Sequence, residues 1–293
     1  MQRFKASTLI ACFFVGLLSA GTTPCAFGFD FPETIEWTPE FIGVESSAVV
    51  LSQPRPLRVH AIRVDLAAEG VSVCTDDDNG DRPEETDGLR TSSFLRLKRC
   101  QVAINGAPFW PGQKEDGGPQ NVVGLVVSGG VLVSPVDDGD KARSALVFRD
   151  GVASIESPPI ELAGIDTAVG GFGVVLRAGE AFRDLSTPPG VLDGVHPRTA
   201  VAVADEGRTL MLFAVDGRQP GYSEGVDLEE LGRLLRHYGA VDGLNLDGGG
   251  TTAMVMADSS GEPQQVNRPI DGKVPGQERV SASHLGVFAT PLP

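Results

Sequence analysis

Short apolar segments, separated by glycine, proline and polar turns, follow one another along most of the chain. Apolar and polar residues roughly alternate from Val59 to Leu66, and β-branched or apolar runs return from Val122 to Val127 and from Leu210 to Val215. Such patterns are typical of β-strands. Gly129 and Gly130 stand between the run that ends at Val127 and another from Val131 to Val133, as in a hairpin turn. The pattern therefore predicts a large sheet, most of it a meander.

Two segments have the pattern of helices. The clearer one begins at Asp227, which is a good N-cap with Glu230 three residues later, and ends before Gly239. A shorter helix is predicted over Ser92 to Lys98, capped by Thr91 or by Ser92 itself. We therefore predict an α+β fold, a single strand-rich domain with a large mixed or antiparallel sheet and few helices.

The N-terminal residues have the order of a secretory signal. Arg3 and Lys5 precede an apolar stretch from about Leu9 to Leu18, and small residues follow. This stretch is shorter than the ~18 residues that cross a bilayer. We therefore divide the chain into a signal peptide (1–26), an N-terminal extension (27–58) and one domain (59–290). We expect an exported protein, periplasmic or extracellular, with no membrane span in the mature chain.

Cysteine usage is consistent with export. Cleavage after Ala26 leaves only Cys74 and Cys100, which we predict to form a disulfide in an oxidising compartment. Two buried thiols are the alternative.

The charge balance narrows the function further. The 39 acidic and 24 basic side chains give a formal net charge of −15, which argues against a nucleic-acid partner. The acidic segment from Asp76 to Asp87 could suggest a calcium loop, but alignment with an EF-hand puts Thr75 and Thr86 at its first and last ligand positions. We therefore expect a solvated loop there, and neither a metal nor a cofactor. Nothing in the sequence indicates an oligomeric state.

The strongest candidate for chemistry is the segment Asn245-Leu246-Asp247-Gly248-Gly249-Gly250-Thr251-Thr252. A strand there ends in a polar pair and continues into three glycines, which permit unusual backbone angles and close approach of a ligand. Their N–H groups could form an anion-binding nest with Asp247 at its rim. A structural turn with a solvated carboxylate is the alternative.

Three further segments add candidates. Asp216-Gly217-Arg218 follows a hydrophobic strand and would place a base or nucleophile beside a guanidinium clamp, although Asp-Gly is also an ordinary turn. Arg198 stands where another strand starts, and its default interpretation is a surface arginine. Asn105-Gly106 precedes two aromatic residues, an arrangement that suits a sugar ring but also a hairpin.

A serine-esterase motif also occurs. Gly221-Tyr222-Ser223-Glu224-Gly225 fits the G-x-S-x-G pattern, and His284 lies downstream. However, a nucleophile elbow needs a strand directly before the serine, and Asp216 to Pro220 intervene. We keep a serine esterase using Ser223 only as an alternative.

Taken in order, Asn105-Gly106, Arg198-Thr199-Ala200, Asp216-Gly217-Arg218, the leucine-rich helix, the Asp247 segment and Glu278-Arg279-Val280 resemble the motifs of the phosphodiester glycosidase family. The resemblance covers roughly Val59 to Phe288. It implies a hydrolase that cleaves the bond between a sugar's anomeric carbon and a phosphodiester. Its substrate would be a sugar phosphodiester, such as an N-acetylglucosamine-1-phosphodiester, or another glycan. With the signal-like N-terminus, we expect an exported hydrolase. A non-catalytic polysaccharide-binding or accessory protein of the cell envelope is the other alternative.

The resemblance also assigns roles to residues. Asp247, and after it Asp216, would stabilise or attack the oxocarbenium-like centre. Positive charge near the departing phosphate would come from arginines, and the sugar and phosphate would be held by a larger set: Asn105, Gly106, Arg198, Arg218, Asn245, Gly248, Gly249, Thr251 and Arg279.

Overall fold

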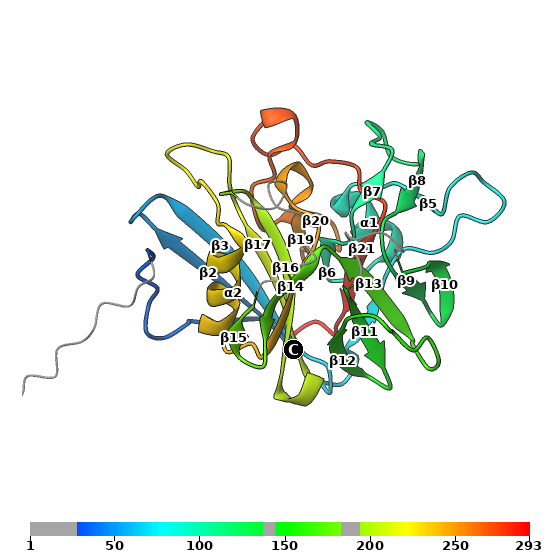
Figure 1. Cartoon of the computed structure of the whole chain (residues 1–293), viewed down its shortest axis with the longest axis horizontal. Coiled ribbons are helices and arrows are strands. Elements are labelled where there is room, and N and C mark those ends of the chain that lie inside the picture. Colours follow the sequence, from blue (N-terminus) through cyan, green and yellow to red (C-terminus); the bar gives the residue numbers. More distant parts are fainter. Residues whose placement is uncertain (1–27, 137–143, 183–193) are drawn as a thin grey trace, which may run out of the picture.

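The computed structural model describes residues 28–136, 144–182 and 194–293, so the predicted signal peptide lies outside the described residues. Its largest element is an eight-stranded antiparallel sheet (Figure 1). The strands, in spatial order, are β1 (Thr38–Phe41), β2 (Val44–Leu51), β3 (Leu57–Asp65), β17 (Thr209–Val215), β16 (Arg198–Ala204), β18 (Asp242–Asn245), β14 (Gly173–Arg177) and β15 (Glu180–Ala181). The prediction of a strand-rich α+β fold with a large antiparallel sheet is confirmed.

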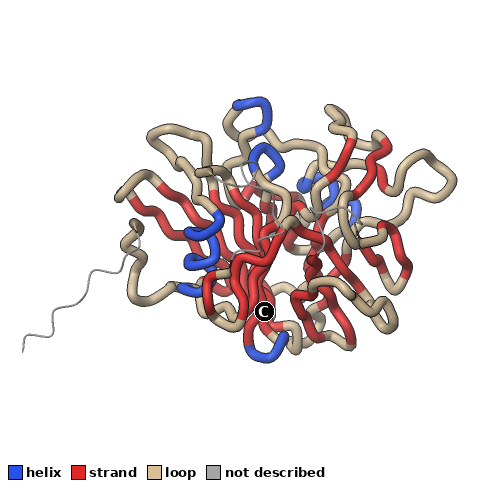
Figure 2. The backbone as a smooth tube through the Cα atoms, in the orientation of Figure 1, coloured by secondary structure: helices blue, strands red, loops and turns tan. Residues whose placement is uncertain are grey.

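Three smaller sheets complete the strand framework. One contains β10 (Val131–Ser134), β9 (Val126–Ser128), β13 (Thr167–Gly171), β11 (Ser144–Arg149) and β12 (Val152–Glu156). Another contains β20 (Pro263–Gln265), β19 (Met254–Ala257), β6 (Val102–Asn105), β21 (His284–Phe288) and β4 (Ser72–Cys74). The third contains β5 (Thr86–Asp87), β8 (Pro119–Val122) and β7 (Phe109–Trp110). Figure 2 shows how strands dominate the molecule and how the helices lie around them.

The large sheet is buried on both faces. Ile62 and Leu212 face one core, where they pack with Leu146 of β11 and Leu285 of β21. Phe213 belongs to the opposite core, which the helix α2 (Leu228–His237) covers with its leucines. Burial on both faces explains why β16 and β17 are almost continuously apolar, since no position on them is left for a solvated side chain.

Both predicted helices form. In α2 the Asp227 side chain accepts from the Glu230 N–H at 2.8 Å and the Glu230 carboxylate accepts from the Asp227 N–H at 3.0 Å, so the predicted capping box is present. Gly239 follows the helix with a φ of 87°, as its predicted terminating position requires.

The shorter helix α1 (Thr91–Lys98) is capped differently from the prediction. Its N-cap is Arg90, which provides no side-chain cap; the Ser92 N–H instead donates to the Glu278 carboxylate at 3.0 Å. The prediction of a cap by Thr91 or Ser92 was wrong because the acceptor comes from a segment far away in the sequence.

The segment that the sequence assigns to an N-terminal extension contributes to the large sheet. Strands β1 and β2 lie within it, and β2 pairs with β3 along its full length from Val44 to Leu51. Phe29 is buried in the core on the α2 side. None of the described helices is long and apolar enough to cross a membrane.

Cys74 and Cys100 are free thiols in the described part of the chain, so the predicted disulfide is not present. The two sulfurs are nevertheless neighbours, because a Cβ added at Gly286 would lie 2.8 Å from Cys74 Sγ and 2.9 Å from Cys100 Sγ. Contact with Cys74 and burial raise the pKa of the Cys100 thiol. The sequence therefore identified a true spatial pair.

Candidate active site

The Asp247 segment crosses from the large sheet to the sheet of β19 and β6. Asp247 lies two residues after the end of β18, and the 3₁₀-helix η2 (Gly249–Thr251) follows. Backbone N–H groups of Leu246, Asp247 and Gly249 donate to carbonyl oxygens of Thr199 (2.9 Å), Gly106 (3.0 Å) and Pro197 (2.9 Å). The turn is therefore anchored to the start of β16 and to the end of β6.

Glycines in this turn make room for two arginines. Gly249 has a φ of 66°, and a Cβ on it would lie 2.8 Å from Arg218 Nη1. A Cβ on Gly250 would lie 2.5 Å from Arg279 Nη2. Both guanidinium groups therefore pack directly on glycine backbone, which is the close approach that the three consecutive glycines permit.

Asp247 has an unusual environment for a carboxylate. Burial raises its pKa to about 6, although hydrogen bonds from Thr251 and the Gly248 N–H and the charges of Arg279 and Arg218 act in the opposite direction. A carboxyl group with such a pKa changes its protonation state near neutral pH. Perturbed groups of this kind are concentrated at functional sites.

The two arginines differ in how they are held. Arg279 donates through Nε to Asp271 at 2.7 Å and through Nη1 to Thr251 Oγ1 at 3.3 Å. Within the described residues, the Arg218 guanidinium has neither a hydrogen bond nor an ion pair. Burial and the nearby charge of Arg279 lower the pKa of Arg218, and Asp247 opposes this shift. Arg218 thus presents donors to the space beside Asp247.

Asn105 binds the turn of Asp247 through its side-chain amide. It is fully buried at the end of β6, its Nδ2 donates to the Asp247 carbonyl at 2.7 Å, and its Oδ1 accepts from Thr199 Oγ1 at 2.8 Å and from the Ala253 N–H at 3.1 Å. These bonds connect three elements. Asn105 therefore holds the turn of Asp247 in position. The sequence analysis considered it only as a ligand of the sugar or phosphate.

Gly106 lies against Ser283. The Gly106 N–H donates to the Ser283 carbonyl at 2.8 Å, the Ala107 N–H donates to Ser283 Oγ at 2.7 Å, and a Cβ on Gly106 would lie 2.4 Å from that oxygen. The Gly106 carbonyl accepts from the Asp247 N–H, so Ser283 and Gly106 together hold the backbone of Asp247 in place.

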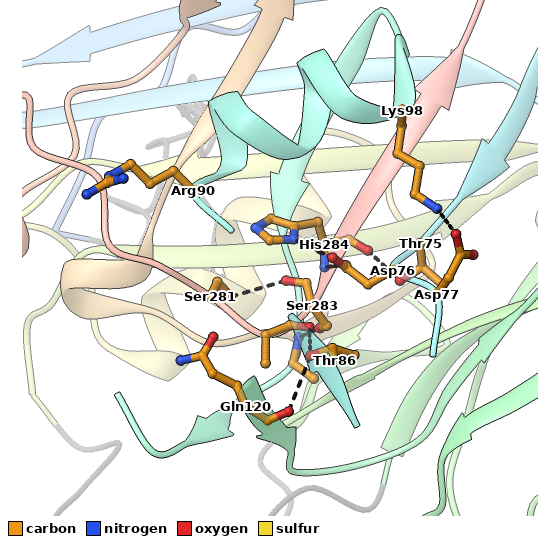
Figure 3. Close-up of polar contacts among 12 residues, drawn as sticks. Thr75, Asp76, Asp77, Thr86, Arg90, Lys98, Gln120, Ser281, Ser283 and His284 are labelled. Carbon is orange, nitrogen blue, oxygen red and sulfur yellow. Dashed lines mark hydrogen bonds and ion pairs between the residues drawn. The ribbon is translucent and has the colours of Figure 1, made fainter. Parts of the chain in front are cut away.

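A buried dyad that the sequence analysis missed holds Ser283 in place. The Asp76 carboxylate accepts from the His284 backbone N–H at 2.6 Å and lies 3.2 Å from its Nδ1, while the Thr75 hydroxyl donates to the His284 carbonyl at 2.6 Å (Figure 3). Asp76 is buried, so its predicted place in a solvated loop was wrong. No local signal could have shown this, because its partner lies 208 positions away.

Asp216 has a different setting from Asp247. It is buried at the end of β17, where Oδ1 accepts from Asn267 Nδ2 (3.1 Å) and from the Arg268 N–H (2.9 Å). Its Oδ2 accepts from the Tyr222 hydroxyl (3.4 Å) and lies 3.2 Å from His60 Nε2. These contacts hold the turn that carries Arg218.

Arg198 and Asn245 lie inside the same end of the sheet. Arg198 is buried and donates to the carbonyl oxygens of Val226 (3.2 Å) and Gly194 (2.9 Å), so the default interpretation as a surface arginine was wrong. Asn245 is buried in β18, and its Oδ1 has no hydrogen-bond partner in the described part of the chain.

Ser223 lacks the setting of a nucleophile. It is buried in the turn after β17, where its hydroxyl donates to the Asp216 carbonyl at 2.6 Å and accepts from the Arg58 N–H at 3.0 Å. The downstream His284 is paired with Asp76 instead. The structure therefore argues against the serine-esterase alternative. Among the described residues, no group of three or more His, Cys, Asp or Glu side chains is placed to hold a metal ion.

Comparison with known proteins identifies the family of the chain. A family model described as phosphodiester glycosidase matches residues 98–288, which include Asn105, Arg218, Asp247 and Arg279. The chain belongs to the phosphodiester glycosidase family. The resemblance inferred from the ordered motifs is thereby confirmed. No curated protein sequence matches the chain.

Two solved structures have a similar fold. One is the catalytic domain of zebrafish N-acetylglucosamine-1-phosphodiester alpha-N-acetylglucosaminidase, auto-inhibited by its pro-peptide, with 20% identity, a TM-score of 0.62, and 87% of this chain and 88% of that chain covered. The other is a hypothetical protein from Synechocystis, with 14% identity, a TM-score of 0.60, and 89% of this chain and 64% of that chain covered. At these identities the similarity concerns the fold.

Proposed function

We propose that the chain is a hydrolase that cleaves the bond between the anomeric carbon of a sugar and a phosphodiester. The observation that carries this proposal is the packing of Arg218 and Arg279 on Gly249 and Gly250, close enough to Asp247 for both charges to act on a carboxyl group whose pKa is raised. A phosphodiester is an anion that two guanidinium groups can bind. A carboxylate can stabilise or attack the oxocarbenium-like centre that develops at the anomeric carbon.

The chemistry of the leaving group determines which roles Arg218 and Arg279 have. A phosphate monoester leaves as an anion of low basicity, so a strong general acid matters less than in an ordinary glycosidase, and fixed positive charge matters more. Arg218, which has donors not used by the described protein groups, binds the phosphate oxygens. Arg279 adds its charge from a position held by Asp271.

Asp247 acts on the sugar side. In its ionised form it stabilises the oxocarbenium-like centre or attacks it directly, and water finally supplies the hydroxyl of the released sugar. The bond between the anomeric carbon and the phosphate oxygen breaks, its electron pair stays on that oxygen, and the second proton of the water passes to the phosphate monoester or to solvent. Asn105 and Asp216 act as positioning residues, the first for Asp247 and the second for the Arg218 turn.

Export to the periplasm or the medium is part of the same proposal. Its support is the signal-like order of the first residues and the adjacency of Cys74 and Cys100, which an oxidising compartment would join without large movement. Mass spectrometry of the secreted protein under non-reducing conditions tests this. A peptide pair linked through these cysteines is expected, and a fully reduced, unprocessed chain would contradict it.

The activity is tested with an N-acetylglucosamine-1-phosphodiester, which the name of the zebrafish structure suggests as a first substrate. Wild type should release the free sugar, and a folded Asp247→Asn variant should not. Glycan binding without turnover in either form would instead favour the polysaccharide-binding alternative.

A further inference from the structure

Two further arginines lie over one tyrosine near this site. The Arg58 Cζ lies 4.4 Å from the centre of the Tyr222 ring, and the Arg268 Cζ lies 4.7 Å from it. Arg268 is exposed, while Arg58 and Tyr222 are half-buried. We call these three residues the Tyr222 cluster. Stacking on the ring holds both planar groups in fixed positions without using their N–H donors.

The donors of the Tyr222 cluster are not satisfied by carboxylates. Among the described residues, neither guanidinium group of this cluster forms an ion pair or a side-chain hydrogen bond. Several other arginines of this acidic protein are paired with carboxylates, such as Arg63 with Glu45 and Arg149 with Glu156. The carboxylate of Asp216 is buried, and it accepts from Asn267, from the Tyr222 hydroxyl and from the Arg268 backbone. Unpaired positive charge is therefore concentrated here.

The Tyr222 cluster is continuous with the candidate active site. In the turn after β17, Gln219 and Ser223 are buried, whereas Arg218 and Tyr222 face outward. The Arg268 carbonyl accepts from Gln219 Nε2 at 2.9 Å. Arg268 also lies three residues before Asp271, which pairs with Arg279. Three residues span at most about 11 Å, so the Cα atoms of Arg268 and Asp271 lie within that distance of each other.

We propose that the Tyr222 cluster is a second anion subsite, which binds a further phosphate of a substrate in which sugars are joined by successive phosphodiesters. This inference rests on the proposed function, since the first phosphate is the one beside Asp247. The negative net charge of −15 repels such a polyanion at long range. A row of unpaired arginines at one end of the sheet offsets that repulsion where the chain must bind.

Calorimetry with two ligands tests the subsite. Every protein titrated carries Asp247→Asn so that neither ligand is hydrolysed, and wild type refers here to the residues of the Tyr222 cluster. The first ligand is a methyl N-acetylglucosamine-1-phosphodiester, and the second is the same compound with another phosphodiester on its aglycone. Wild type should bind the second ligand about tenfold more tightly, an effect of the size expected for one or two charge-assisted hydrogen bonds. In the Arg58→Gln/Arg268→Gln double variant this ratio should fall to about one.

Arg208→Gln is the matched control, because Arg208 is an exposed arginine at the opposite end of β17 and the substitution removes the same charge. It should keep the tenfold ratio. Arg268→Gln alone, at an exposed position, provides a second variant if the double variant does not fold, and it should lower the ratio severalfold. Equal binding of both ligands by wild type, or an unchanged ratio in the Arg268→Gln variant, would overturn the subsite.

Binding is measured independently of turnover, so the two proposals can fail separately. Absence of sugar release from either ligand, with the binding ratio preserved, would contradict the hydrolase and leave the second subsite supported. Sugar release with equal binding of both ligands would do the reverse.

Discussion

The Arg218 guanidinium lies against the backbone of Gly249, close enough that a Cβ on this glycine would come within 2.8 Å of Nη1. The absence of a side chain at Gly249 therefore permits this position of the Arg218 guanidinium. The carboxylate of Asp247 and the Arg218 guanidinium are brought together by this contact and by the bonds that anchor the turn to β6 and β16.

Gly249→Ala should therefore disable the site. The added methyl group displaces Arg218, so we expect kcat/KM to fall about 100-fold, the size of losing one group that stabilises developing charge. The φ of 66° adds a cost of about 1 kcal/mol in unfolding free energy. Steady-state kinetics and urea unfolding measure the two effects.

Gly129→Ala is the control for backbone strain. Gly129 has a φ of 55° in the hairpin between β9 and β10, and a Cβ there meets nothing within 4 Å. It should lose a similar ~1 kcal/mol of stability and keep its activity. Equal losses of activity in both variants would refute the steric explanation.

The pH profile should report Asp247. If the ionised carboxylate acts on the sugar, kcat/KM falls as the pH drops through about 6, the value to which burial raises this pKa. Below that value the loss approaches tenfold per pH unit. Kinetics on protein that stays folded by circular dichroism provide the test. An acidic limb at the ordinary 3.8 of an aspartate would contradict this assignment.

Removing the charge of Asp247 should also change stability. The folded pKa of about 6 lies above the ordinary 3.8, so this group favours folding most at low pH, and that contribution is lost as the pH rises through about 6. Near neutral pH the ionised group costs on the order of 2 to 3 kcal/mol. Asp247→Asn should therefore unfold at higher urea concentration than wild type at about pH 7, with the difference closing toward pH 4. A variant less stable at both pH values would count against a buried, costly carboxylate.

Asp76→Asn tests the support below the site. Asp76 is the acceptor for the His284 backbone N–H and contacts its ring, so its replacement should lower the unfolding free energy by about 2 to 4 kcal/mol. We also expect a lower kcat, because Ser283 and Gly106 transmit the position of Asp247.

Asp77→Asn is the matched control for that substitution. The neighbouring Asp77 is exposed and pairs with Lys98 at the surface, so the change should cost less than about 1 kcal/mol and leave kcat unaltered. Similar effects of both substitutions would show that the dyad has no special role.

The parts that the sequence predicted correctly depend on neighbours along the chain. The capping box of Asp227 and Glu230 and the Gly129-Gly130 hairpin are local, and both form as predicted. The order of motifs also pointed to the family, whose model matches residues 98–288, and the structure brings Arg218 and Arg279 to the glycines that follow Asp247.

What the sequence could not show depends on distant partners. Glu278 caps α1 across 186 positions, and Asp76 is buried against His284 across 208 positions. Asn105 looked like a sugar ligand because its motif precedes two aromatic residues, whereas its amide is used to bind Asp247 and Thr199. Only the packing of four sheets determines which polar groups remain available to a substrate.

We propose that the protein hydrolyses a sugar-1-phosphodiester with Asp247 and the neighbouring Arg218 and Arg279. The most direct measurement is release of free N-acetylglucosamine from an N-acetylglucosamine-1-phosphodiester by purified wild type and by Asp247→Asn, with folding of both checked by circular dichroism. We predict turnover by wild type and a loss of at least about 1000-fold in the folded variant. Equal rates of release by the two proteins would contradict the account.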